Sequence, residues 1–172
     1  SLGIDEQING FTLIPWALSF DYYDVASNSV RFVKAKPGDS AYESYWLPFL
    51  KDFAGHLRQK GWFDITTISI DERGEEAMKN AFELIFRADP QYKISGQVHY
   101  FPELEPYMYE LTLAYMQHVP ADVLETRRKS GKITKVYTCC SEPFPNVFTF
   151  STPAEGTWTM WHAIAGDYDG YL

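Results

Sequence analysis

Two adjacent carboxyl groups, Asp71 and Glu72, are the side chains of this chain best suited to chemistry. They follow residues 63–70, a short β-branched segment that predicts a strand ending where they begin. Two carboxyls this close repel each other's ionisation, so one can serve as an acid while the other stays charged and stabilises positive charge. The alternative is structural: Asp71 caps the next helix, while Glu72, Glu75 and Glu76 favour its positive N-terminal end.

Three further residues near predicted strand ends, Tyr23, His99 and Tyr137, are candidates for contact with a substrate. Tyrosine rings offer flat apolar faces on which sugar rings can stack, and Tyr22 and Tyr100 share that property. A histidine at a strand end can act as a base or as a ligand contact. Each of these residues, taken alone, also fits a role in packing.

Strand-like and helix-like segments alternate along the chain. Strands are expected at residues 11–20, 63–70, 92–100, 111–116, 133–140 and 168–172. Helices are expected at residues 42–60, 77–88, 121–130 and 153–165, the last after the capping box Thr152-Pro153-Ala154-Glu155. Pro15 weakens the first strand because proline breaks a ladder, and a helix starting near Pro106 competes with the strand at 111–116.

This alternation predicts an α/β fold with a parallel sheet and right-handed crossovers. Two architectures fit, an incomplete (β/α)8 TIM barrel and an open doubly wound parallel sheet. In both, ligands meet the carboxyl ends of the strands, where Asp71 and Glu72 stand. No Gly-rich phosphate loop follows the first strand, so nucleotide binding is not indicated. A sequential strand order would indicate the barrel, and a switch point the doubly wound sheet.

The composition narrows the class of partner. The 172 residues include 15 Lys+Arg and 23 Asp+Glu, and a net charge of −8 argues against nucleic acid, which needs a cationic face. The sequence has no run of about 18 apolar residues, so no membrane span is predicted. No signal peptide is expected either. The compartment, cytoplasmic or exported, stays open.

Several smaller features have structural interpretations. The neighbours Cys139 and Cys140 are expected to be buried thiols at a strand end, and neither a metal nor a cofactor is expected. Trp158 and Trp161 lie at helical spacing and are predicted to be core residues. The acidic stretch formed by Glu103, Glu105 and Glu110 is predicted to be solvated.

Several segments together resemble the catalytic domain of glycoside hydrolase family 123. They are Leu13-Ile14-Pro15-Trp16, Ile70-Asp71-Glu72-Arg73, Val136-Tyr137-Thr138-Cys139-Cys140, Pro145 to Glu155, and Asp169-Gly170-Tyr171-Leu172. The Thr-Cys-Cys and Phe-Thr-Phe-Ser parts are distinctive in combination, and the resemblance runs over nearly the whole chain. It implies a (β/α)8 barrel that removes a terminal β-linked N-acetylgalactosamine from a glycan with retention of configuration.

The resemblance also implies a substrate-assisted mechanism and roles for individual residues. The 2-acetamido oxygen of the sugar attacks the anomeric carbon and forms an oxazolinium-like intermediate. Asp71 would orient and stabilise the acetamido group, and Glu72 would protonate the leaving oxygen and then activate water. Tyr137 lies within a matching segment and is expected to contact the sugar, whereas His99 and Tyr23 qualify only by position.

A barrel of this type needs about 250 residues, so we expect a single-domain fragment covering about strands 3 to 8. Its open edges favour association with a second copy, and the 172-residue chain alone is expected to be inactive. Two other functions stay open. One is a non-catalytic carbohydrate-binding or scaffold module on the same fold, and the other is a glycosidase with carboxylates from different strands.

Overall fold

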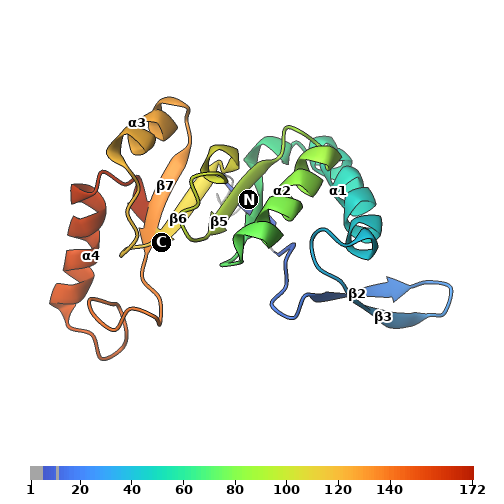
Figure 1. Cartoon of the computed structure of the whole chain (residues 1–172), viewed down its shortest axis with the longest axis horizontal. Coiled ribbons are helices and arrows are strands. Elements are labelled where there is room, and N and C mark those ends of the chain that lie inside the picture. The colour runs from blue at the N-terminus through green and yellow to red at the C-terminus, as the bar shows by residue number, and fades with distance from the viewer. Residues whose placement is uncertain (1–5, 11) are drawn as a thin grey trace. The chain divides into compact units, whose positions relative to one another are not determined.

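The computed structural model describes residues 6–10 and 12–172, which form two compact units, one up to Ile94 and one from Ser95 (Figure 1). The first unit contains β1 (Ile8–Gly10), β2 (Ser19–Asp24), β3 (Ser29–Lys34), α1 (Ser40–Lys60), β4 (Thr66–Ile70) and α2 (Glu75–Ala88). β5 (Lys93–Gln97) crosses the boundary. The second unit contains β6 (Glu110–Ala114), α3 (Ala121–Lys129), β7 (Ile133–Tyr137), α4 (Pro153–Ala165) and β8 (Gly170–Tyr171). Short 3-10 helices lie at Phe63–Ile65 and Glu105–Tyr107.

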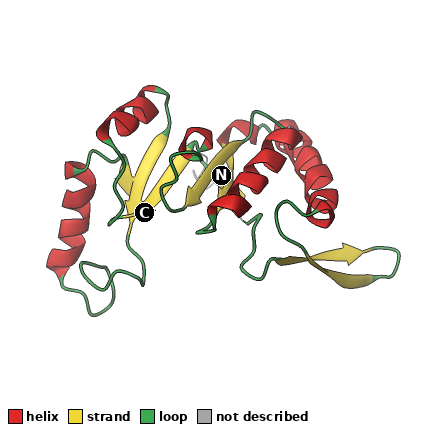
Figure 2. Cartoon of the chain, viewed as in Figure 1, coloured by secondary structure: helices red, strands yellow, loops and turns green. Residues whose placement is uncertain are grey.

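The strand order within the sheet distinguishes between the two predicted architectures. Six strands share one sheet in the order β1-β4-β5-β6-β7-β8, while β2 and β3 form a separate antiparallel hairpin (Figure 2). The pairs β1–β4, β5–β6, β6–β7 and β7–β8 are parallel. The order follows the chain without the switch point of a doubly wound sheet, which confirms the α/β fold of the partial TIM-barrel type.

In the first unit, α1 and α2 pack against each other beside β1 and β4. Every residue of β4 is buried, as expected of a strand covered on both faces. α1 begins at Ser40 and continues through Pro48, which lies inside the helix. α2 turns Met78, Phe82 and Ile85 into the core, at the spacing of one helical face.

The first predicted strand, at residues 11–20, is wrong in position. β1 lies earlier, at Ile8–Gly10, where it pairs in register with Thr66 to Ile68 of β4. Residues 12–18 form bends and a turn, in which the Leu18 amide donates to the Pro15 carbonyl over 3.0 Å. The apolar character of this segment comes from Leu13 and Ile14, which are buried without belonging to a strand. Phe11 lies outside the described residues.

The hairpin of β2 and β3 is inserted between this loop and α1. One face packs on α1, where the ring of Phe20 meets those of Tyr45 and Trp46 at 5.5 and 5.4 Å. The opposite face pairs Tyr23 with Val30 across the strands, and both side chains are exposed. The hairpin therefore buries one face and presents the other to solvent.

The second unit is organised around a buried arginine. Arg127 of α3 is 2% exposed and forms an ion pair of 2.6 Å with Glu105. Its guanidinium also donates to the Thr134 hydroxyl over 2.8 Å and to the Ile133 carbonyl over 2.8 Å. The prediction of a solvated acidic stretch is therefore wrong for Glu105, and also for Glu110, which is buried and pairs with Lys135 over 3.0 Å.

α4 starts at the predicted capping box but exposes its tryptophans. Its buried residues are Glu155, Thr159 and Ala163, so small and polar side chains face inward. Trp158 and Trp161 are 43% and 64% exposed, and the prediction that they are core residues is wrong. Helical spacing alone does not say which face turns inward.

The cysteines also differ from the prediction. β7 ends at Tyr137, so Cys139 and Cys140 lie in the following loop as free thiols. Cys139 is half-buried and Cys140 is exposed, because β7 ends before both of them rather than at Cys140. Separately, no helix in the described part of the chain has both the length and the apolarity needed to cross a bilayer.

Candidate active site

Parallel pairing of β1 and β4 brings two distant loops of the first unit together. Gly10 at the end of β1 is level with Ile68 of β4, so the segments that follow both strands leave the same edge of the sheet. Trp16 lies in the loop after β1, and Asp71 directly follows β4. This carboxyl edge is where ligands bind in parallel α/β folds.

Asp71 is held at this edge through one carboxylate oxygen. The indole Nε1 of Trp16 donates to Oδ2 of Asp71 over 2.9 Å, and Nη1 of Arg73 lies 3.7 Å from the same oxygen. Among the described residues, none donates a hydrogen bond to Oδ1. The Asp71 side chain is 28% exposed, so this second oxygen is available to a ligand.

Arg73 is the buried member of this cluster, with a side chain only 7% exposed. Its Nε donates to the Ile14 carbonyl over 2.9 Å, and its Nη1 donates to the Glu72 carbonyl over 2.7 Å. Its guanidinium carbon lies 3.7 Å from the centroid of the Trp16 ring, a cation–π contact. Burial lowers the pKa of Arg73, and the charges of Asp71 and Glu72 oppose this shift.

The structural alternative for Asp71 is not supported. The N-cap of α2 is Gly74, and Asp71 lies three residues before it. Glu75 and Glu76 do occupy the first turn of α2, where a negative charge is favourable, as predicted. Asp71 and Glu72 are half-buried in the turn that joins β4 to α2, outside the helix.

Tyr23 lies in the same unit, on the exposed face of the hairpin. Its side chain is 58% exposed, and its hydroxyl donates to Oδ1 of Asn28. This hydrogen bond ties Tyr23 to the turn of its own hairpin. The contacts described for Asp71 involve Trp16 and Arg73 rather than Tyr23.

His99 and Tyr137 belong to the second unit. His99 follows β5 and is exposed, and its Nδ1 lies 2.7 Å from Nε2 of Gln117, so its ring has a polar partner. The Oε1 atom of the same Gln117 accepts from the Tyr100 amide over 2.7 Å. Tyr137 is the last residue of β7 and is buried, and its carbonyl accepts from the Tyr115 amide over 2.9 Å.

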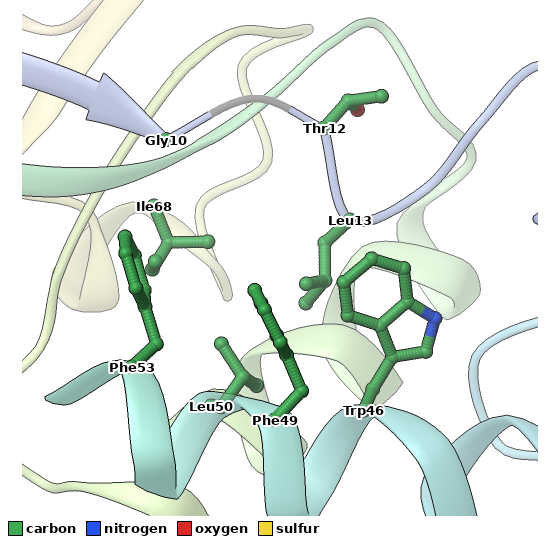
Figure 3. A pocket seen from close by; sticks show the side chains of 8 residues that line it. All are labelled: Gly10, Thr12, Leu13, Trp46, Phe49, Leu50, Phe53 and Ile68. Carbon is green, nitrogen blue, oxygen red and sulfur yellow. The ribbon is translucent and has the colours of Figure 1, made fainter. Parts of the chain in front are cut away.

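An apolar pocket of about 220 Å³ opens beside β1 and α1, with no Asp or Glu among its lining residues (Figure 3). Figure 3 shows aromatic rings of α1 on one side and the chain after β1 on the other. Its lining residues are Gly10, Thr12, Leu13, Trp46, Phe49, Leu50, Phe53 and Ile68. None of these side chains titrates near neutral pH, so the pocket cannot supply the acid–base groups of a catalytic centre.

Trp16 and Arg73 are the residues that the sequence did not mark as parts of the site. Both belong to segments that resemble the family, but nothing in their spacing shows that a loop 55 positions away contacts Asp71. Within residues 6–10 and 12–172, no group of three or more His, Cys, Asp and Glu side chains is arranged to hold a metal ion.

Comparison with known proteins identifies the family. The chain matches the family model "Glycoside hydrolase 123, catalytic domain" over residues 1–172. It also resembles the solved structure of a family 123 glycoside hydrolase from Clostridium perfringens, a protein studied for glycolipid glycan hydrolysis. The two share 28% identity with a TM-score of 0.86 over 96% of this chain, which spans 30% of the length of the other. No curated protein matches the chain. The sequence, the strand order and this match together show that the chain belongs to glycoside hydrolase family 123, as part of its catalytic domain.

Proposed function

We propose that the complete protein containing this chain removes a terminal β-linked N-acetylgalactosamine with retention, and that Asp71 and Glu72 carry the reaction. The observation that supports this most directly is the carboxylate of Asp71, held through Oδ2 at the carboxyl edge of the sheet with Oδ1 available. Family membership supports the reaction class. The subject of the Clostridium perfringens structure suggests the glycan of a glycolipid as the substrate class.

In the first step, the acetamido oxygen of the sugar forms a bond to the anomeric carbon. The bond from that carbon to the leaving oxygen breaks, and Glu72 transfers its proton to the leaving oxygen. The product is an oxazolinium-like ring whose N–H carries positive charge. Oδ1 of Asp71 accepts this N–H, and the negative charge of the carboxylate stabilises the ring.

In the second step, the carboxylate of Glu72 takes a proton from water, and the water oxygen attacks the anomeric carbon. The bond to the acetamido oxygen breaks, which restores the acetamido group and leaves the sugar with its original configuration. Glu72 is then protonated again and ready for another substrate. Asp71 acts in both steps without forming a covalent bond.

The test is Glu72→Gln in the complete protein, assayed on aryl N-acetyl-β-galactosaminides with poor and good leaving groups. With a poor leaving group, kcat should fall about 100-fold or more, because general acid catalysis is lost. A good leaving group needs no proton, so cleavage of the glycosidic bond should fall less. A thiazoline mimic of the intermediate should inhibit the wild type.

Three outcomes count against the proposal. Undiminished turnover by Glu72→Gln would contradict the acid–base role of Glu72. Hydrolysis of a plain β-galactoside as fast as that of the N-acetyl-β-galactosaminide would contradict participation of the acetamido group. Sugar binding without hydrolysis in the complete wild-type protein favours a non-catalytic carbohydrate-binding module.

A further inference from the structure

We propose that Trp16 is a positioning residue for Asp71, and that Arg73 holds Trp16 in place. The indole N–H occupies Oδ2 and thereby fixes Oδ1 as the oxygen that meets the acetamido group of the substrate. This inference rests on the proposed function, because it assigns how the same carboxylate is oriented. It adds two residues to the site that lie outside the Asp71–Glu72 pair.

The three side chains form a closed triangle of contacts. Trp16 Nε1 lies 2.9 Å from Asp71 Oδ2, Arg73 Nη1 lies 3.7 Å from the same oxygen, and the Arg73 guanidinium lies 3.7 Å from the Trp16 ring centroid. Each member therefore touches the other two. A displacement of any one of them breaks two contacts, so the triangle resists rotation of the carboxylate.

Burial of apolar surface does not explain where Trp16 lies. Its side chain is 72% exposed, so its position depends on the hydrogen bond to Asp71 and on the guanidinium against its ring. An indole N–H is a donor only, and its described acceptor is a carboxylate, which makes the bond charge-assisted. A large exposed aromatic side chain held this way beside a candidate catalytic group is better suited to orientation than to core packing.

Arg73 gives the triangle a rigid base. Its side chain is 7% exposed, and its hydrogen bonds to the carbonyls of Ile14 and Glu72 join the loop after β1 to the turn after β4. The ring of Trp16 therefore rests on a group that is itself fixed to the segments that follow both strands. Such preorganisation removes carboxylate rotation before the substrate arrives, and stabilises charge that develops during the reaction.

The test compares Trp16→Phe with Trp62→Phe in the complete protein. Phenylalanine keeps a ring above Arg73 but has no N–H, so the substitution removes the hydrogen bond to Asp71 and little else. Trp62 is a matched control, since it is another partly exposed tryptophan of the same unit and is not a described contact of Asp71. Trp62 is 45% exposed, and Trp16 is 72% exposed. Thermal unfolding and circular dichroism should show that both variants fold like the wild type.

Trp16→Phe should lower kcat by about 10-fold to 100-fold, the effect of losing a hydrogen bond to a charged group, with little change in KM. Affinity for the thiazoline mimic should fall by a similar factor, while affinity for N-acetylgalactosamine should fall much less, because its neutral acetamido N–H gains less from a charged acceptor than the charged ring does. This difference between the two affinities distinguishes orientation of Asp71 from a purely structural role of Trp16. A structural role would lower the affinity for both ligands by the same factor. Trp62→Phe should behave as the wild type, and wild-type kcat in Trp16→Phe would overturn the inference.

A double-substitution cycle separates this inference from the proposed function. If Trp16 acts through Asp71, Trp16→Phe should have almost no further effect in a protein that already carries Asp71→Asn. Additive losses would show that Trp16 acts elsewhere, while Asp71 keeps its role. An Asp71→Asn variant with full activity would instead contradict the proposed function. Arg73→Lys, which keeps the charge but loses the planar fork, should resemble Trp16→Phe in its kcat and thiazoline effects.

Discussion

The indole nitrogen of Trp16 and Oδ2 of Asp71 lie 2.9 Å apart, although 55 positions separate the two residues in sequence. The parallel pairing of β1 with β4 accounts for this proximity, because both residues follow neighbouring strands at the same edge. Glu72 comes next in the chain, so the strand that places Asp71 also places the second carboxyl of the pair.

Replacing Asp71 with Asn should lower kcat of the complete protein about 100-fold or more on an N-acetyl-β-galactosaminide. The asparagine has nearly the same shape but no charge, so it cannot balance the positive ring of the intermediate. Added azide distinguishes the two carboxyls, because it attacks the intermediate without a general base. Azide should restore turnover of a substrate with a good leaving group in Glu72→Gln but not in Asp71→Asn, and rescue of both would contradict the assigned roles.

Replacing Arg127 with Met should destabilise the fold by about 3–5 kcal/mol, because the half-buried Glu105 carboxylate loses the buried guanidinium that balances its charge. Glu105 is its partner at 2.6 Å, and the carbonyl of Ile133 would also lose a donor. The adjacent Arg128 provides the control, since its side chain is 45% exposed and pairs with Asp167 at the surface. Arg128→Met should cost far less than Arg127→Met in urea unfolding, because an ion pair at the surface contributes little, and equal losses would contradict this account.

The carboxylate of Glu155 in the first turn of α4 should make the stability of the protein depend on pH in the acid range. Hydrogen bonds to the Glu155 carboxylate lower its pKa from the ordinary 4.5. The bond donated by the Thr152 amide has the largest effect, and the Asn146 amide donates a further one. Because the pKa of Glu155 is lower in the folded state than in the unfolded state, the charged carboxylate stabilises the protein fully at pH values above the unfolded pKa. This stabilisation is lost as the pH falls through the folded pKa. The melting temperature of the wild type should therefore approach that of Glu155→Gln as the pH falls below 4.5 and through the lowered pKa of Glu155. Melting temperatures that stay equally far apart from pH 7 to pH 3 would contradict this link.

Two glycines with positive φ should respond differently to alanine. Gly61 ends α1 at φ +72°, and the place that a β-carbon would take there is open, so Gly61→Ala should cost only the backbone strain, about 1 kcal/mol. At Gly38, φ is +96° and the added carbon would lie 2.7 Å from Nδ2 of Asn80. Gly38→Ala should therefore lower the free energy of unfolding by more than Gly61→Ala. A loss at Gly38 no larger than the loss at Gly61 in urea unfolding would show that Asn80 moves aside without cost.

Local patterns in the sequence predicted most of the elements. The capping box at Thr152 and Glu155 marks the start of α4. This signal succeeds because capping depends on a few neighbouring residues. The run at residues 11–20 was misleading because burial of Leu13 and Ile14 requires apolar side chains without requiring a strand.

The carboxyl pair could be identified from the sequence, and its surroundings could not. Residue type and place at the end of a β-branched segment were enough to choose Asp71 and Glu72. Which face of α4 turns inward, which acidic residues are buried, and which side chains hold Asp71 depend on contacts between segments far apart in the chain. Trp16 reaches Asp71 only because two parallel strands end side by side, and strand pairing is a property of the tertiary structure.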